Sequence, residues 1–138
     1  EFQARAAEVA KLAPTAAPLE TALASNRVFE LVFQFLSNYD DVVPAEVIGL
    51  DYLDFEAKLQ ALAGDRRAAE TAVADLAATW KGLAPEVISA GGEQPAASFD
   101  QHVSTMQDLL KSGTDKQLAD EAQNGLDLVD EIEVVYAG

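Results

Sequence analysis

The 138-residue sequence contains no cysteine and only one histidine, and these scarcities exclude several kinds of site. Without cysteine the chain can form no disulfide, thiolate zinc site, iron–sulfur cluster or cysteine nucleophile. A Ser/His/acid triad would have to use His102, and the sequence has neither a Gly-x-Ser-x-Gly elbow nor a phosphate-binding loop. We therefore predict that the protein is not an enzyme.

Basic residues are also scarce, because 9 Lys and Arg stand against 24 Asp and Glu, for a net charge of -15. Phosphate binding needs clustered Lys and Arg, so this charge excludes nucleic acid as a partner and disfavours anionic membrane surfaces. The partners that it favours are cationic: a metal ion, a basic protein or a polyamine. The alternative is that the charge only keeps a helical protein soluble and monomeric.

Long apolar runs are absent. No run approaches the roughly 18 residues of a membrane span, and the most apolar stretch, residues 28–36, is interrupted by Glu30 and Gln34. The only methionine is Met106, so we expect a processed mature protein or a trimmed one. A protein stripped of its signal peptide has this form, which predicts an extracytoplasmic location, periplasmic or secreted.

What the sequence has in abundance is alanine, with apolar residues recurring every three or four positions, and this pattern is typical of helices. Proline and glycine punctuate it, which predicts helices over residues 18–39, 44–63, 66–90, 95–112 and 115–137. Within the third helix, Pro85 predicts a kink or break. Asp65 is expected to cap that helix, and Thr114 with Gln117 matches a capping box.

The connections are short, and short links make sequential helices antiparallel neighbours. We therefore predict an all-α fold, an antiparallel up-and-down helical bundle of four to five helices that forms a single domain over residues 18–138. Residues 1–17 are expected to be a poorly ordered segment or a short helix. The apolar seams predicted to face the core are Ile48, Tyr52, Phe55, Leu59 and Leu62; Val73, Leu76, Trp80, Leu83 and Val87; Phe99, Val103, Met106 and Leu110; and Leu118, Ala122, Gly125, Val129, Ile132 and Tyr136.

The first helix has an apolar surface too wide for a single stripe. The leading interpretation places this helix at the centre of the bundle, surrounded by the others. Alternatively, its second face packs against another copy of the chain as a homodimer, or lines a ligand cavity. Val28, Leu31 and Phe35 are the candidate interaction surface.

Few residues are candidates for metal binding. His102 and Met106 are spaced i, i+4 on one helix face and could form a soft site for Cu(I), but no second His or Met supports them. The alternative is a histidine beside the core. Two neighbours on one helix cannot be trans haem ligands, so we predict no cofactor. The pairs Asp51 and Asp54, and Asp127 and Asp130, could form carboxylate sites or simply solvated helix faces.

Three parts of the chain carry a family resemblance: residues 46–65, Trp80 with Gly91-Gly92 and Phe99, and residues 126–133. Together they resemble uncharacterised bacterial secreted or lipid-anchored helical-bundle proteins. The resemblance implies an extracytoplasmic lipoprotein or secreted protein and no transferable activity. The chain also resembles the cytochrome c-prime bundle superficially, but it lacks the haem-attachment cysteines, so haem binding does not carry over.

These observations predict a non-enzymatic, extracytoplasmic binding or interaction protein with an acidic surface. The alternative is a small-ligand or metal carrier that uses a bundle cavity or the pair His102 and Met106.

Overall fold

The computed structural model describes residues 5, 7, 18–36 and 43–137, and the regular elements in these ranges are all α-helices. They are α2 (Pro18–Leu36), α3 (Ala45–Leu62), α4 (Arg66–Ser89), α5 (Glu93–Ser112) and α6 (Asp115–Ala137). The predicted all-α fold is confirmed. The predicted N-terminal segment lies outside the described residues apart from two positions, so its state stays a prediction.

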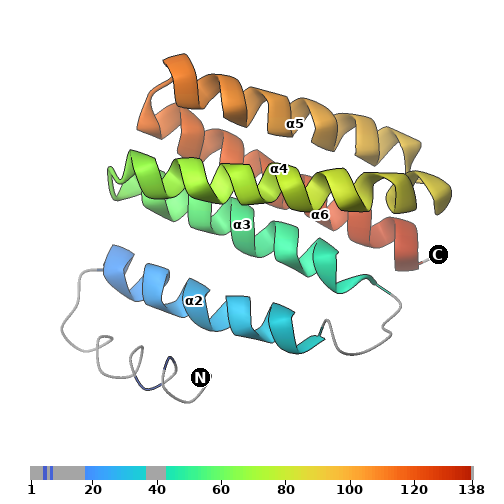
Figure 1. Cartoon of the computed structure of the whole chain (residues 1–138), viewed down its shortest axis with the longest axis horizontal. Coiled ribbons are helices and arrows are strands. Elements are labelled where there is room, and N and C mark those ends of the chain that lie inside the picture. Colours follow the sequence, from blue (N-terminus) through green and yellow to red (C-terminus); the bar gives the residue numbers. More distant parts are fainter. Residues whose placement is uncertain (1–4, 6, 8–17, 37–42, 138) are drawn as a thin grey trace.

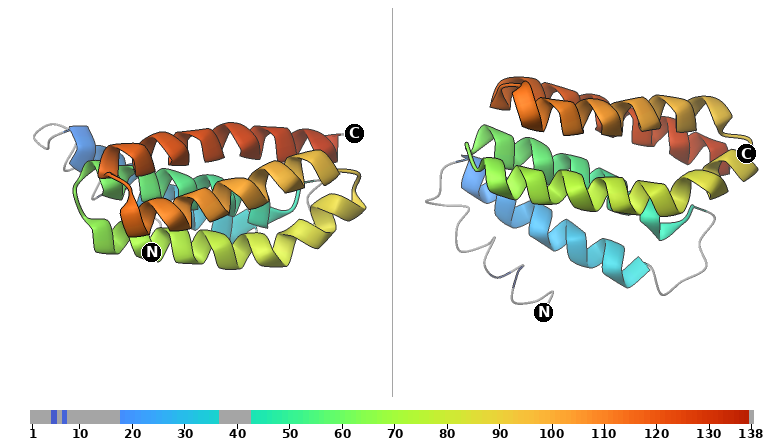
Figure 2. Two further views of the ribbon diagram at one scale, coloured as in Figure 1. Left: turned by 90° about the horizontal axis from the view of Figure 1, so that it is seen from above. Right: turned by 45° about the horizontal axis from the view of Figure 1, so that its top comes forward.

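Helices α3 to α6 form a four-helix bundle in which each helix packs against the next (Figure 1). The last helix, α6, returns to lie against α3 and closes the ring, as the two views of Figure 2 also show. This is the up-and-down arrangement that the short connections predicted. Outside the ring, α2 packs on α3 alone among the described helices.

The predicted central position of the first helix is wrong. The central helix is α3, which contacts α2, α4 and α6, whereas α2 leaves Phe35 61% exposed. A central helix must bury several of its sides, and α3 does so partly with small and polar residues such as Gly49, Ala57 and Gln60. Counting large apolar residues therefore underestimated the buried surface of α3 and overestimated that of α2.

The deepest seam of α3 is also different from the predicted one. The predicted Leu62 is 54% exposed, and Ile48, Tyr52 and Phe55 are only partly buried. The fully buried positions follow a 3, 4 spacing one or two positions earlier: Val47, Leu50, Asp54, Ala57 and Ala61. An acidic residue in the middle of this stripe hid it from an apolar count.

The predicted seams of the other bundle helices agree better with the structure. All five positions of the α4 seam are buried, and so are the first five positions of the α6 seam. On α5, Phe99, Val103 and Met106 are buried and Leu110 is partly buried. In these three helices no charged residue interrupts the predicted apolar seam. Apolar periodicity therefore located the core correctly.

Helix α4 does not break at Pro85 but continues to Ser89. Proline leaves the carbonyl of Lys81 without its helical partner. Both Lys81 and Pro85 are exposed, so water can satisfy that carbonyl and the helix survives.

Two of the predicted helix starts, those of α4 and α6, are confirmed by their hydrogen bonds, whereas the fourth helix starts at Glu93 and not at the predicted Pro95. The Asp65 carboxylate accepts a hydrogen bond from the Ala68 amide at 3.0 Å. At the start of α6, the Thr114 amide donates to Gln117 Oε1 at 2.9 Å and the Gln117 amide donates to Thr114 Oγ1 at 3.2 Å. This reciprocal pair is a capping box, and it satisfies amides that the first turn of a helix leaves free.

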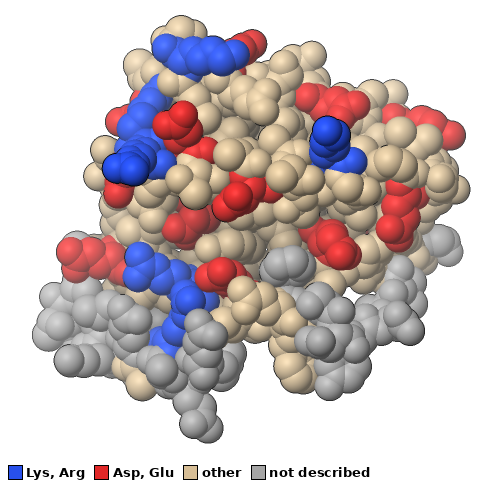
Figure 3. All heavy atoms as spheres, viewed as in Figure 1, with Lys and Arg blue, Asp and Glu red and all other residues tan. Residues whose placement is uncertain are grey.

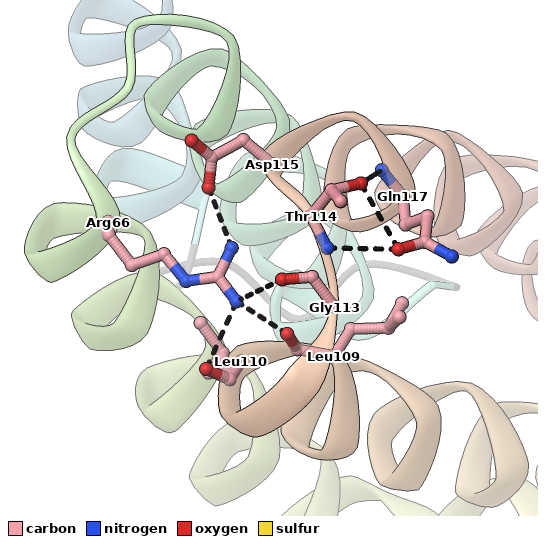
Figure 4. A network of polar contacts seen from close by, with 7 residues as sticks. All are labelled: Arg66, Leu109, Leu110, Gly113, Thr114, Asp115 and Gln117. Carbon is pink, nitrogen blue, oxygen red and sulfur yellow. Dashed lines mark hydrogen bonds and ion pairs between the residues drawn. The ribbon is translucent and has the colours of Figure 1, made fainter.

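The guanidinium of Arg66 ties the start of α4 to the turn between α5 and α6 (Figure 4). One nitrogen donates to Asp115 at 2.6 Å. The other points at the carbonyl oxygens of Leu109, Leu110 and Gly113, at 2.5, 3.0 and 2.9 Å. The Leu109 carbonyl also accepts a hydrogen bond from the Gly113 amide at 2.8 Å, and the other two carbonyls lie in the last turn of α5 and directly after it. Arg66 therefore caps one helix and anchors the next.

The core of the bundle is divided into two parts. Toward the start of α3 it contains large side chains, among them Leu50, Trp80 and Phe99. Toward the end of α3 it is built mainly from alanines together with Met106 and Leu118. Asp54 on α3 and Gly125 on α6 stand between residues of the two parts and belong to neither cluster. His102 on α5 also belongs to neither, and it lies beside Val103 of the first part and one turn before Met106 of the second.

Candidate functional site

A buried polar layer occupies the boundary between the two halves of the core. The ring of His102 is 1% exposed and its two nitrogens face carboxylates on different helices. Nε2 lies 2.9 Å from Asp54 Oδ1 on α3, and Nδ1 lies 2.8 Å from Glu121 Oε1 on α6. The single histidine therefore bridges α3, α5 and α6 through the interior of the bundle.

Asp54 is fully buried, and its second oxygen, Oδ2, has no hydrogen-bond partner among the described residues. Both Asp54 and His102 lie against the backbone of Gly125 on α6. A Cβ added to Gly125 would come closer than 3.0 Å to the Asp54 carboxyl and to the imidazole. A glycine is therefore required at this position because the two polar side chains occupy the space of any larger residue.

The protonation of this layer follows from its surroundings. Burial lowers the pKa of His102, but the hydrogen bonds and charges of Asp54 and Glu121 outweigh burial, so the pKa is raised. Burial also raises the pKa of Asp54, and His102 offsets this only in part. Both pKa values are raised, so Asp54 and His102 together hold a proton to a higher pH than the two groups would if they were separate and in water.

A neighbouring carboxyl, Asp51, lies one helical turn before Asp54. Burial raises its pKa to about 7, and the charges of Glu133, Asp130 and Asp54 contribute to the rise. Asp127 and Asp130 are exposed, as expected of a solvated helix face. The same interpretation is wrong for Asp54, because α6 covers that position and the pattern of α3 alone cannot show it.

The predicted metal pair, His102 and Met106, is buried in the core, with Met106 in the alanine-rich cluster. The polar contacts of His102 are with Asp54 and Glu121, so both ring nitrogens are already engaged. Among the described residues no group of three or more metal-ligating side chains is arranged to hold an ion. The Cu(I) site stays a prediction that gains no support from this geometry.

A groove of about 480 Å³ lies between α2, α3 and α4. Three carboxylates from these three helices line it: Glu30, Glu56 and Asp75. Apolar surface comes from Leu53, Ala68, Ala72 and the ring of Tyr52, and the remaining lining residues are Gln34, Thr71 and Thr79. The groove is therefore amphipathic and negatively charged, and its size is that of a typical ligand site.

Two of these carboxylates already have partners within the chain. Glu30 pairs with Arg5 at 3.3 Å, and Glu56 accepts hydrogen bonds from Asn26 and Gln60, each at 2.7 Å. Burial raises the pKa of the Tyr52 hydroxyl, and Glu30 and Glu56 raise it further. Asp75 is exposed at the α4 side of the groove.

The predicted interaction residues of α2 do not share one environment. Leu31 is buried, Val28 is half-buried and Phe35 is exposed. Their positions neither establish nor exclude an interface, and the homodimer stays a prediction.

The spacing of Asp54 and His102 in the sequence is a signal for the polar layer that a count of apolar residues misses. Asp54 interrupts a 3, 4 repeat between Leu50 and Ala57, and His102 stands between Phe99 and Met106 with the same spacing. Polar residues at such positions are buried when the helix packs. The repeat shows that each is interior, but which residues meet depends on helix order and register.

Comparison with protein-family models, with curated proteins and with solved structures finds no match to this chain. Of the predicted resemblance, the all-helical domain is confirmed and no family is identified. None of the described helices is long and apolar enough to cross a membrane.

Proposed function

We propose that the protein is a non-enzymatic binding module, located outside the cytoplasm, whose groove between α2, α3 and α4 binds a basic amphipathic helix of a partner protein. The observation that carries this proposal is the convergence of Glu30, Glu56 and Asp75 on a groove with apolar walls. The extracytoplasmic location rests on the sequence resemblance.

The shape of the groove suits a helix. Helices α2 and α4 both lie along α3 and α2 makes no contact with α4, so α3 forms the floor of a channel between them. A helix laid in such a channel buries its apolar face against Tyr52 and Leu53, and its Lys or Arg side chains reach the carboxylates. The contact between Arg5 and Glu30 supports this chemistry, because a guanidinium already pairs at the groove.

The charge of the whole molecule favours the same class of partner. The net charge is -15, and in Figure 3 Lys and Arg gather mostly at the end of the bundle where α4 begins, whereas Asp and Glu spread over the rest of the face. The electrostatic field of a protein with a large net charge speeds the encounter with an oppositely charged partner, and added salt weakens this attraction.

Binding rather than catalysis is supported by the state of His102. A general base needs a ring nitrogen that can reach substrate, and both nitrogens of His102 contact carboxylates inside the core.

The test is fluorescence anisotropy with a labelled synthetic helical peptide that carries Lys on one face and Leu on the other. Two charge reversals are compared, Asp75→Lys in the groove and Asp127→Lys on the exposed face of α6, because they change the net charge equally. We expect Asp75→Lys to weaken binding about tenfold, and Asp127→Lys to change it little. Circular dichroism confirms that both variants are folded.

Two outcomes would overturn the proposal. Equal weakening by the two reversals would show attraction to the overall charge and not to the groove, and absence of binding at low salt would exclude this partner class. Calorimetry with spermine addresses the small-ligand alternative, since one-to-one spermine binding without peptide binding would identify a carrier of small cations.

A further inference from the structure

The polar layer lies beside small residues of α3 and α6. Ala57 and Ala61 on α3 belong to the same buried cluster as Ala119 and Ala122 on α6, and Gly125 lies against Asp54 and His102. Small side chains let helix axes approach each other. Asp54 and Glu121 belong to these two helices, and His102 joins them from α5.

Counting hydrogens shows that this arrangement needs an extra proton. Each of the two contacts, Nε2 to Asp54 and Nδ1 to Glu121, requires one hydrogen between its heavy atoms. A neutral imidazole supplies only one. The second hydrogen lies either on Nε2, as an imidazolium, or on Asp54 Oδ1, as a carboxylic acid, and the total is the same in both cases.

Loss of that proton leaves two buried acceptors facing each other. With the remaining hydrogen on Nδ1, imidazole Nε2 and Asp54 Oδ1 would be 2.9 Å apart with no hydrogen between them, in a site where neither atom is exposed. With that hydrogen on Nε2, imidazole Nδ1 and Glu121 Oε1 would face each other in the same way at 2.8 Å, at a side chain that is 21% exposed. Burying unsatisfied polar atoms and an unpaired carboxylate is costly. The packed bundle is therefore complementary to the protonated layer and not to the deprotonated one.

The charged groups acting on the imidazole are Asp54 from α3 and Glu121 from α6. Its other ring contact in the described core is Phe99, at 5.1 Å between centroids in an edge-on arrangement. No charged group from α4 acts on the imidazole among the described residues. Asp51 lies one turn from Asp54, and the charge of Asp54 contributes to the raised pKa of Asp51.

We propose that Asp54, His102 and Glu121 form a proton-binding switch that holds α3, α5 and α6 together when protonated and loosens the bundle when the proton is lost at alkaline pH. Because the folded state holds the proton more tightly than the unfolded chain, the added stability is complete below the unfolded pKa of histidine, near 6.5. It is lost as pH rises through the higher folded pKa. The equilibrium constant for folding then falls by up to about tenfold per pH unit.

The test uses the fact that the chain has one histidine, so its ring protons can be followed individually by NMR between pH 5 and 10 in the whole protein. We expect the folded chain to titrate at a midpoint above 6.5, with ring nitrogen shifts of a doubly protonated imidazole or of a neutral ring beside a protonated Asp54. In Asp54→Asn, we expect about tenfold weaker proton binding at His102, because its strongest buried anion is gone. Asp127→Asn, an exposed carboxylate of the same helix as Glu121, should leave the midpoint unchanged.

Urea unfolding across the same pH range gives the second measurement. The unmodified chain should lose stability above pH 6.5, and Asp54→Asn should lose less over that interval. A midpoint at or below 6.5 in the unmodified chain overturns the proposal even if Asp54→Asn does not fold. A midpoint that Asp54→Asn does not change overturns it as well.

Discussion

At the scale of single residues, the interior of this bundle depends on side chains that are neither large nor apolar. Asp54, His102 and Gly125 occupy core positions on three helices. A buried ion pair is weak evidence for stability, since its desolvation can equal its attraction, but it can specify which helices meet and in which register. The absence of a Cβ at Gly125 is the geometric condition for that contact.

Gly125→Ala should destabilise the protein by about 1–3 kcal/mol, because the new methyl group would overlap Asp54 and His102 and force them or α6 to move. The measurement is urea unfolding followed by circular dichroism. Gly82→Ala is the matched control, since an added Cβ there meets nothing within 4 Å. That control should gain up to about 1 kcal/mol from helix propensity. Equal effects at the two glycines would contradict the close packing at Gly125.

Asp51→Asn should stabilise the protein at pH 8 and have no effect near pH 4. The pKa of Asp51 is raised to about 7 in the fold from an ordinary value of 3.8. Ionisation therefore costs the folded state more than the unfolded one, and stability falls as pH rises from 4 through 7. Asparagine removes that loss, which we expect to be about 1 kcal/mol because solvent screens a half-buried carboxyl. The urea unfolding midpoints of the unmodified protein and of Asp51→Asn at pH 4 and pH 8 measure this difference in stability. A gain in stability of equal size at both pH values would contradict the mechanism.

At the scale of helices, the ends are held by defined contacts and the faces by their neighbours. The cap at Asp65 and the capping box of Thr114 and Gln117 are local, so α4 and α6 begin where their own sequence directs. The contact of Arg66 with the α5–α6 turn is not local, since it joins residues 43 to 49 positions apart in the chain. This contact fixes where one end of the α5–α6 hairpin sits on α4.

Arg66→Lys should lower the free energy of unfolding by about 1–3 kcal/mol, because an ammonium cannot bridge a carboxylate and three carbonyls as the guanidinium does. Hydrogen exchange should rise first in the turn that Arg66 caps, around Gly113. Arg67→Lys is the control, as the neighbouring side chain is exposed. If the two substitutions have the same effect, the cap contributes nothing beyond its charge.

At the scale of the whole molecule, the structure is a four-helix bundle with an additional helix on one side. Among the described helices α2 packs on a single neighbour, whereas every helix of the ring packs on at least two. The described contact of α2 with the ring includes one buried polar anchor, Asn26, which donates to Glu56 at 2.7 Å. Elements with fewer buried contacts open at lower free energy.

Amide hydrogen exchange measured by mass spectrometry should therefore show α2 exchanging before α3 to α6 in native conditions. Asn26→Ala should increase exchange in α2 further, because Glu56 loses a donor, and should leave α5 and α6 unchanged. Protection of α2 equal to that of α3 would show that the molecule opens as one unit, against this expectation.

The helices, most of their ends and three of the core seams follow from the order of the amino acids alone. Those features depend on interactions within a few residues: the 3, 4 spacing of Val73, Leu76 and Trp80, the cap at Asp65, and the reciprocal pair of Thr114 and Gln117. Only the packed molecule shows that α3 is central, that α2 is peripheral and that His102 meets Asp54 and Glu121. Those contacts join residues far apart in the chain, and whether a carboxylate is solvated or buried depends on the helix that covers it.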